Sequence, residues 1–440
     1  MYNLNCEVVL HIVYIQLHFL SREEDIILNE RVILHCDMNN FYASVECMLN
    51  PTLKDYAVVV GGSVEERHGI VLAKNYKAKS YGIQTGEAIW QAKNKCKDIV
   101  VVPPNYEHYL KFSKLAREIY SRFTDLVEPF GMDECWLDVT GSTGIFGTGE
   151  EIAESIRQTI KFELGLTVSI GVSYNKIFAK LGSDLKKPDA ITVLKSSTFQ
   201  DKIWQLPASD LLGVGRATDK KLKQYGIHTV GDLATADEKL LISIFGINGS
   251  KLKQYANGLD TSVVTANDYI FPIKSIGHGI TTIQDLENSA EVWCVMLSLV
   301  QDIGTKLRKH KKKASGIAID IRNNELQTRQ WQIKIDIPTW SSIHLAKTAF
   351  KLFESNYNWQ HDIRSITVRA INLVEEDTPI QIDLFTDVRL VEKREKLDLA
   401  IESIRQRFGK DAIGNAVLFQ NIKLPPKQNV ELIMPTGMVK

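Results

Sequence analysis

Three carboxylates stand in or beside apolar, strand-like runs of this chain, where they could hold divalent cations. Asp37 ends the apolar run that begins at Ile33, and Asp133 and Glu134 lie within a second run. A buried carboxylate is costly unless a cation or hydrogen bonds meet it. Mg²⁺ prefers oxygen ligands such as carboxylates. Two such ions can activate a hydroxyl and stabilise a leaving pyrophosphate, so the three side chains predict a two-metal centre.

The adjacency of Asp133 and Glu134 sets a geometric condition on that centre. Neighbouring side chains of a regular strand point to opposite faces of the sheet. Both carboxylates can reach one metal centre only if the backbone turns or bends between them and the strand. Taken singly, each carboxylate also fits a helix cap or a salt bridge.

Two lysine-bearing segments could bind a polyphosphate. Tyr76 and Lys79 are three residues apart and share a face if they lie on a helix. The segment Ser173–Pro188 carries further lysines. Polyphosphate binding needs several cations brought from separate segments, although either segment alone also fits an exposed helix face.

The elements that must position these groups mix helices and strands. Residues 105–127 carry apolar side chains at spacings of three and four, which predicts a helix closed by Pro129. Leu166–Ser173 alternates apolar with small or polar residues, the pattern of a strand with one face on the core. Together they predict an α+β catalytic domain over Arg31–Leu194.

The rest of the chain divides into a helix-rich part, Leu206–Leu259, and a second, smaller α+β domain, Phe271–Val374. Thr265–Pro272 is the expected linker between them. Strands are expected at Ala314–Ile321, Trp331–Ile337 and Ile366–Leu373, and helices at Val292–Arg308, Ile343–Glu354 and Val391–Phe408.

Composition sets the class of protein. The 440 residues exceed one ordinary core, and contents of 44% hydrophobic and 24% charged residues are those of a globular protein. The net charge is zero, but Gln301–Lys334 holds nine basic and three acidic residues. That surplus indicates a local anionic partner or a solvated helix face.

Cysteine usage and the N-terminus bear on the compartment. The six cysteines are scattered without a CxxC pair, which disfavours a zinc ribbon or a disulfide framework and fits a reducing cytoplasm. Val8–Leu20 is apolar but too short to span a bilayer, and it lacks the features of a signal peptide. Residues 1–30 are therefore interpreted as an extension of uncertain role.

With these residues the chain resembles the Y-family of DNA polymerases, in its DinB/UmuC-like translesion class, over about residues 31–375. The family's first metal-binding segment matches Asp37–Glu46, and its acidic pair matches Asp133 and Glu134. The resemblance implies two Mg²⁺ ions held by Asp37, Asp133, Glu134 and the backbone carbonyl of Met38.

The same resemblance implies the nucleotide contacts. Phe41 and Tyr42 match the nucleotide-stacking and steric-gate positions, so the ring of Tyr42 is expected to exclude a ribose 2′-hydroxyl. Tyr76, Lys79 and Lys187 match the triphosphate-binding positions.

Two positions depart from the family pattern. Position 79 is often arginine in the family, and Lys79 cannot form the same planar fork, so a weaker or differently angled phosphate contact is expected. Asn39 stands where many relatives carry a second acidic residue. It has no charge, and we assign no metal binding to it.

DNA contacts are expected in the two later domains. Gly213, Gly215 and Arg216 fit a helix-hairpin-helix turn in the family's thumb, where backbone N–H groups approach a phosphate. A lone glycine turn is also a common helix connector. In the little finger, contacts to the duplex backbone without base reading are expected from Lys274, Lys309 and Lys311.

A short motif in the tail resembles a sliding-clamp-binding peptide. In Gln381–Phe385, the anchors Leu384 and Phe385 would enter an apolar pocket while Gln381 bonds at its rim. The alternative for so short a motif is an edge strand.

The resulting hypothesis is an α+β multidomain, right-hand polymerase that extends primers past damaged bases with low fidelity, in translesion synthesis and DNA repair. We expect a cytoplasmic monomer, not bound to membranes, that uses primer-template DNA, dNTPs and the sliding clamp. The rivals are a template-independent nucleotide cyclase and a catalytically dead DNA-binding scaffold. The expected domains are a palm (31–40 and 105–194), fingers (41–104), a thumb (195–264), a linker (265–273), a little finger (274–375) and a tail (376–440).

Overall fold

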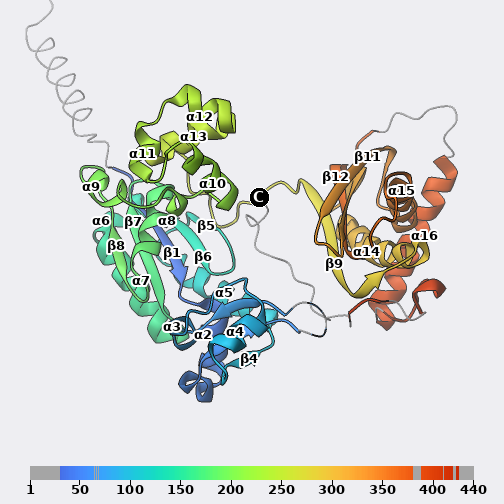
Figure 1. The fold of residues 1–440 in the computed structure, drawn as a ribbon, viewed down its shortest axis with the longest axis horizontal. Coiled ribbons are helices and arrows are strands. Elements are labelled where there is room, and N and C mark those ends of the chain that lie inside the picture. Colours follow the sequence, from blue (N-terminus) through green and yellow to red (C-terminus); the bar gives the residue numbers. More distant parts are fainter. Residues whose placement is uncertain are drawn as a thin grey trace, which may run out of the picture.

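The structure is a computed structural model that describes residues 30–63, 65, 67, 69–379, 388–409, 411–419 and 423–425. The expected extension, except its last residue, and the clamp-binding motif Gln381–Phe385 lie outside the described residues. Figure 1 shows an N-terminal body, from β1 to α13, and a C-terminal body that begins at β9, with an extended segment between them.

A five-stranded sheet forms the centre of the N-terminal body. Its strand order is β5-β6-β1-β7-β8. The middle strand, β1, is antiparallel to both β6 and β7 and is buried along its whole length. The strands are β1 (Ile33–Met38), β5 (Val127–Pro129), β6 (Glu134–Asp138), β7 (Val168–Ser173) and β8 (Ile191–Val193).

Helices cover both faces of this sheet. Leu34 and Cys36 of β1 share one core with α5 (Tyr106–Tyr120) and α7 (Gly149–Leu164). On the other face lies α8 (Lys176–Leu185), whose Ser183 meets His35 of β1. Asp37 alternates with Cys36 along β1 and therefore faces the α8 side.

The expectation that Leu166–Ser173 has only one face on the core is wrong. All six residues of β7 are buried, because α7 and α8 sandwich the strand. Gly171 lets α8 approach: a Cβ there would come within 1.9 Å of the carbonyl oxygen of Ala179. The small residues that alternate along this strand make room for a helix and do not mark a solvent face.

The predicted helix over residues 105–127 is too long. α5 ends at Tyr120, and a turn follows in which the Thr124 hydroxyl donates to the carbonyl oxygen of Asp138 at 2.7 Å. Val127 then pairs with Leu137 as the start of β5. The last residue of the apolar pattern, Val127, therefore belongs to a strand paired with β6 and not to the helix.

A small sheet and short helices form the next layer. Its order is β3-β2-β4, with β2 antiparallel to β3 and parallel to β4. This part comprises α2 (Phe41–Leu49), η1 (Pro51–Asp55), β2 (Val58–Gly61), β3 (Val71–Lys74), α3 (Tyr76–Ser80), α4 (Ile89–Lys95) and β4 (Val100–Val102). The short elements η2 (Thr140–Ser142) and α6 (Thr143–Phe146) precede α7 in the chain.

A helical part follows the central sheet in the chain. Its apolar side chains form one core that also includes Ile177 and Phe178 of α8. The helical part is therefore packed against α8, the helix that covers one face of the central sheet. The elements are α9 (Phe199–Ile203), η3 (Ala208–Asp210), α10 (Arg216–Gln224), α11 (Val230–Thr235), α12 (Glu238–Phe245) and α13 (Ile247–Ala256).

The chain that leaves α13 is fastened to the central sheet before it reaches the C-terminal body. Glu128 of β5 accepts the backbone N–H of Thr265 at 2.9 Å and pairs with Lys176 at 2.6 Å. The backbone N–H of Asn267 donates to the carbonyl oxygen of Asp125 at 3.0 Å. The first residues of the expected linker are thus part of the N-terminal body.

The C-terminal body is a four-stranded antiparallel sheet with helices on one face (Figure 1). The strand order is β11-β10-β12-β9, and α14 and α15 pack on the face that forms the core. Its elements are β9 (Ser275–Leu286), α14 (Ser289–Lys309), β10 (Lys312–Asn323), β11 (Thr328–Thr339), α15 (Ser342–Asn356) and β12 (Ile363–Glu375).

The tail helix α16 (Val388–Phe408) docks on this body through charged contacts. Glu402 pairs with Arg308, and Glu395 accepts from both Lys313 and Thr339 at 3.0 Å. η4 (Ala416–Phe419) follows. The helices expected near the end of the chain are therefore present, and the last one belongs to the C-terminal body.

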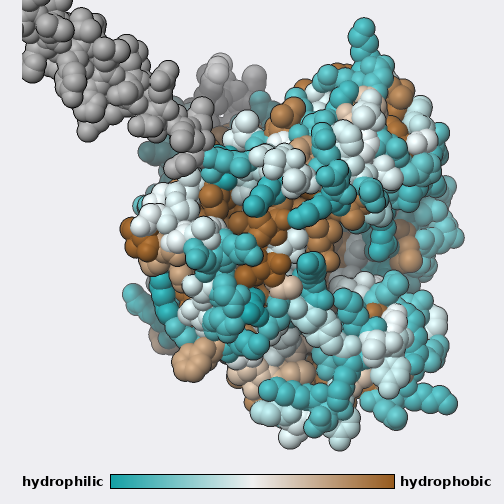
Figure 2. All heavy atoms as spheres, turned by 90° about the vertical axis from the view of Figure 1, so that its left-hand side faces the viewer, coloured by the Kyte–Doolittle hydropathy of each residue, from teal (hydrophilic) through white to brown (hydrophobic). Residues whose placement is uncertain are grey.

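Figure 2 views the side of the molecule that carries α6, α7 and β8, and it shows mostly hydrophilic residues around an apolar area near the middle. Among the described residues, no helix has the length and apolar character needed to cross a bilayer.

Candidate active site

The three predicted carboxylates come together at one end of the central sheet. Asp37, near the end of β1, lies opposite Glu134, the first residue of β6, in the strand register. Asp133 stands in the bend over residues 130–133 that precedes β6, and its carbonyl oxygen accepts the N–H of Met38 at 3.0 Å. The bend that the adjacency of Asp133 and Glu134 requires is therefore present.

Lysines occupy two of the carboxylates in this structure. Lys187 Nζ lies 2.7 Å from Asp37 Oδ2, and Lys180 Nζ lies 2.7 Å from Glu134 Oε2. Within the described part of the chain, no group of three or more His, Cys, Asp or Glu side chains is arranged as a ready metal cage. The carboxylates are gathered but turned toward lysines, so they would have to reorient to share a cation.

Electrostatics at the site fit a bound cation. Burial raises the pKa of Asp37 to about 6, against the opposing effect of Lys187. Burial, together with the charges of Asp37 and Glu134, raises the pKa of Asp133 to about 7. Three carboxylates therefore share a partly buried site with Lys180 and Lys187, and their hard oxygen donors suit Mg²⁺.

Glu134 differs from its two neighbours because positive and polar groups surround it. Burial by itself would raise its pKa, but His35 and Lys180 lower it to about 2. The imidazole of His35 is fully buried beneath the site, with Nε2 3.3 Å from Glu134 and Nδ1 2.8 Å from the Ser183 hydroxyl. Burial lowers the pKa of His35 to about 4, so the ring is neutral at pH 7.

Sequence reasoning did not identify His35 and Lys180 as partners of Glu134. A signal was available in the case of His35. It lies two residues before Asp37 on the same strand and so must share its face.

The two aromatic residues after β1 are in different environments. Phe41 is 3% exposed and packs in the core, so its ring is not open to a nucleotide. Tyr42 is half-buried and stacks on Tyr109 with centroids 4.2 Å apart and an interplanar angle of 9°. Tyr109 in turn donates to Glu46 at 2.7 Å. The ring of Tyr42 is therefore held rigidly at the start of α2.

The candidate phosphate-binding residues lie on α3 and after α8. Tyr76 and Lys79 share a face of α3, with Lys79 Nζ 5.6 Å from the ring centroid of Tyr76. Burial raises the pKa of Tyr76, and the charges of Lys187 and Asp37 also act on it. Tyr76 on α3 therefore lies within electrostatic range of Lys187 and Asp37.

Asn39 takes no part in the carboxylate group and has a different partner. Its side-chain oxygen accepts the backbone N–H of Asp189 at 2.8 Å, and its amide nitrogen donates to Ser169 at 2.9 Å. Asp189 in turn pairs with Arg157 and Lys161 of α7, both at 2.8 Å. Sequence reasoning missed this network because its members are scattered along the chain.

The residues expected to contact DNA are at exposed turns. Gly215 caps α10, and Arg216 is exposed at the first position of that helix. Lys274 is exposed just before β9. Lys309 and Lys311 are exposed at the turn between α14 and β10.

Acidic residues of the chain itself neutralise part of the basic stretch Lys306–Lys313. Arg308 pairs with Glu402, Lys312 with Glu375 and Lys313 with Glu395. The positive surplus counted along the sequence is therefore smaller in the folded protein, since α16 and the end of β12 supply the counter-charges.

The open face of the C-terminal sheet offers another approach for a polyanion. In the strand register, Gly277, Arg369, Ala318 and Gln332 form one row across β9, β12, β10 and β11. Neighbouring rows are also made mostly of small or polar residues. Small residues allow a phosphate backbone to lie close to the sheet, and Arg369, which pairs with Asp320 at 3.2 Å in this structure, could exchange that partner for a phosphate.

Comparison with known proteins gives separate family matches for the N-terminal and the C-terminal part of the chain. Residues 36–184 match the impB/mucB/samB family, and residues 273–384 match the C-terminal domain of that family. The chain is 50% identical over 392 residues to "DNA polymerase IV" of Acetivibrio thermocellus, covering 89% of this chain and 98% of the relative. It is 36% identical over 384 residues to "DNA polymerase IV 1" of Bacillus subtilis, covering 87% and 92%.

A solved structure shows the same fold. The "Y-family DNA polymerase chimera Dbh-Dpo4(243-245)-Dbh" matches with a TM-score of 0.71 at 24% identity, covering 78% of this chain and 99% of that one. At this identity the likeness concerns the fold alone.

Proposed function

The chain belongs to the impB/mucB/samB family, as a DinB-type Y-family DNA polymerase, and on that premise we propose that it copies damaged templates with low fidelity by two-metal-ion catalysis. It is a DNA-directed DNA polymerase, that is, a nucleotidyltransferase. The observation that carries the proposed mechanism is the convergence of Asp37, Asp133 and Glu134 beside Lys187 and Tyr76.

The residues divide the work between cations and phosphates. When bound, two Mg²⁺ ions would lower the pKa of the primer 3′-hydroxyl and neutralise charge on the triphosphate. Asp37, Asp133 and Glu134, with the carbonyl of Met38, would hold them. Lys187 would exchange its bond to Asp37 for bonds to phosphate oxygens. Tyr76 and Lys79 would bind the same group from α3.

The sugar and the duplex are assigned to other parts of the chain. Tyr42, fixed by its stacking on Tyr109, would exclude a 2′-hydroxyl at the sugar position. The turn at Gly213–Arg216 and the open sheet face around Arg369 would hold the backbone of the primer-template. The C-terminal body is the feature that disfavours a template-independent cyclase, which has no duplex to hold.

The sliding clamp is the proposed protein partner, and the cytoplasm is the proposed compartment. Gln381–Phe385 would bind the sliding clamp through Leu384 and Phe385. Replacing both anchors by alanine should abolish clamp-stimulated synthesis and leave clamp-free primer extension unchanged. Monomers in the cytoplasm are proposed as the working state, and Cys36, Cys47, Cys96, Cys135 and Cys294, the described cysteines, are free.

Primer extension tests the metal assignment. Asp133→Asn combined with Glu134→Gln removes two charges without a large change in volume, and we expect loss of template-directed extension by several orders of magnitude. Asp138→Asn, at the far end of the same strand, is the matched control and should remain active. Unchanged extension in the double variant would overturn the assignment, and extension without a template would favour a cyclase.

The same assay on damaged templates tests the substrate range. Extension past a lesion that stops a high-fidelity polymerase is expected, with raised misincorporation on undamaged template. A product that ends at every lesion would contradict the proposed translesion role.

A further inference from the structure

The loop that carries Lys187 contains a residue in an unusual backbone conformation. Asp189, two positions after Lys187, has φ 53°, in the left-handed region that side chains other than glycine, asparagine and aspartate rarely adopt. Such a conformation persists only where surrounding contacts hold it. Both the backbone and the side chain of Asp189 have such contacts.

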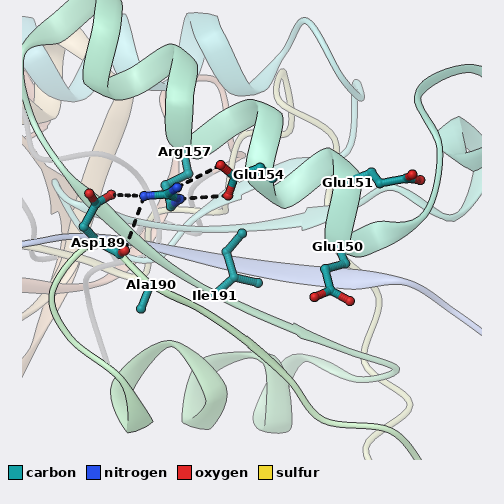
Figure 3. A pocket seen from close by; sticks show the side chains of 7 residues that line it. All are labelled: Glu150, Glu151, Glu154, Arg157, Asp189, Ala190 and Ile191. Atoms are coloured by element: carbon teal, nitrogen blue, oxygen red, sulfur yellow. Dashed lines mark hydrogen bonds and ion pairs between the residues drawn. The ribbon is translucent and has the colours of Figure 1, made fainter.

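On the outer side, α7 holds the Asp189 carboxylate. Arg157 Nη1 donates to Asp189 Oδ1 at 2.8 Å, and Lys161 donates to Oδ2 at 2.8 Å. The remaining donors of Arg157 are fixed by Glu154, at 2.9 and 2.8 Å. Figure 3 shows Arg157 lying between the two carboxylates, Glu154 on its own helix and Asp189 on the loop.

The inner side of the loop is held from the catalytic strand. Asn39, the residue immediately after β1, accepts the backbone N–H of Asp189 at 2.8 Å. Asn39 is 2% exposed, and its amide is fixed in turn by Ser169 of β7. One loop residue therefore ties β1, which carries Asp37, to the outer helix α7.

This arrangement matters because Lys187 must serve two partners. Its Nζ lies 2.7 Å from Asp37 and 2.9 Å from Asp184 in this structure. To reach a triphosphate it must leave Asp37. If the loop backbone stays fixed, this exchange needs only a change of side-chain rotamer.

We propose that Arg157, Asp189 and Asn39 are positioning residues that fix the backbone of the Lys187 loop and so set the affinity for the incoming dNTP. The proposal rests on the proposed function, since it takes Lys187 to be a triphosphate ligand. None of the three touches the reacting atoms. Arg157 acts from the outer surface through Asp189, and Asn39 acts from β1.

The chain offers a control pair whose carboxylate lies on the same helix, α7. Arg122 forms a two-pronged pair with Glu163, near the other end of α7, with Nη2 2.7 Å from Oε2. Arg122→Ala therefore removes another, more exposed arginine–carboxylate pair without touching the Lys187 loop.

A double-mutant cycle between Arg157 and Lys187 tests the proposal. We expect Arg157→Ala to raise the KM for dNTP about fivefold while kcat at saturation and the Kd for DNA stay within about twofold, a coupling typical of residues in one network. In a Lys187→Ala background the same change should have almost no further effect. Equilibrium dNTP binding to enzyme on a dideoxy-terminated primer should show the same pattern without turnover.

Conservative variants and stability separate positioning from a general structural role. Asp189→Asn keeps the tolerance for left-handed backbone and an acceptor for Arg157, so dNTP affinity should fall between those of wild type and Arg157→Ala. Arg122→Ala should leave dNTP affinity unchanged. A merely structural role would instead lower the melting temperature, kcat and DNA affinity together.

Each negative outcome has a distinct meaning. If Lys187→Ala itself leaves dNTP affinity unchanged, the assignment of Lys187 under the proposed function is wrong. If Lys187→Ala weakens dNTP binding but Arg157→Ala weakens it equally in both backgrounds, or not at all, the positioning role is overturned.

Discussion

At the scale of single residues, the ionisation of Asp133 lowers the stability of the folded protein. Burial and two neighbouring carboxylates raise its pKa to about 7, whereas an aspartate in an unfolded chain titrates near 4. Between these values the folded protein binds more protons than the unfolded one. Ionisation of Asp133 therefore makes the free energy of unfolding fall as the pH rises through this window.

Asp133→Asn should accordingly stabilise the metal-free protein while abolishing catalysis. The gain is on the order of a few kcal/mol at pH 8, above both pKa values, and about half as large at pH 5.5, which lies midway between the unfolded and folded pKa values. Thermal unfolding in EDTA at the two pH values measures the difference. Asp138→Asn is the control, and an equal gain at both pH values would contradict the electrostatic account.

Tyr42 gives a second prediction at this scale. Tyr42→Ala removes the ring at the proposed sugar position and should raise ribonucleotide incorporation relative to deoxynucleotide incorporation by at least tenfold, about 1.4 kcal/mol of discrimination. Tyr42→Phe keeps the ring and loses only the contact of the hydroxyl with Met132 Sδ at 3.4 Å. It should discriminate like wild type, and a large effect of Tyr42→Phe would shift the role from the ring to the hydroxyl.

Sequence reasoning could point to the three carboxylates and to Tyr42 because each belongs to a short, recognisable segment. The same reasoning assigns no role to Asn39, because its uncharged amide does not suit the metal-binding role of an acidic residue. Its actual partner, the backbone of Asp189, lies 150 positions away and leaves no trace in local spacing. The partners of a side chain across the fold could not be predicted in this way.

At the scale of elements, the positions of strands and helices were easier to predict than the surroundings of each element. Periodicity predicted α14, α15 and the tail helix within a few residues. It predicted the wrong environment for β7, because a strand covered by helices on both sides can carry small residues for close packing. Periodicity also placed the end of α5 too far along the chain, because Val127 is apolar as a buried residue of β5 and not as part of the helix.

The docking of α16 can be tested through one pair. The side chains of Arg308 and Glu402 are 9% and 21% exposed. Glu402→Ala leaves a nearly buried guanidinium without its counter-charge and should cost about 1–3 kcal/mol of stability in the C-terminal body. Glu392→Ala, exposed on the same helix, should change stability by less than about 0.5 kcal/mol. Thermal unfolding compares them, and equal melting temperatures would argue against docking.

At the scale of the whole molecule, the division into two bodies followed from length and pattern, but the balance of charge did not. The basic stretch Lys306–Lys313 is partly matched by residues that lie about 60 to 95 positions further along. A count along the sequence shows only the local excess of basic over acidic residues. Only the fold shows that the tail lies against it.

The linker provides a prediction at this scale. Thr265 and Asn267 are bonded to the N-terminal body, whereas Tyr269 is 50% exposed beyond the last of these bonds. Within residues 250–290, brief chymotrypsin treatment should cleave after Tyr269 and spare the bond after Leu259, although Leu259 is also exposed. Mass spectrometry of the fragments locates the cut, and preferred cleavage after Leu259 would show that the fastened segment opens.

The fastening of Thr265 and Asn267 also limits how far the two bodies can separate. Only Asp268 to Lys274 remain as a free tether, and seven residues span at most about 24 Å when fully extended. A duplex that slips from one body while the other still holds it therefore stays tethered to the body it left, and rebinding is intramolecular at an effective concentration in the millimolar range. The short tether between the two bodies thus favours rebinding of the template over its dissociation.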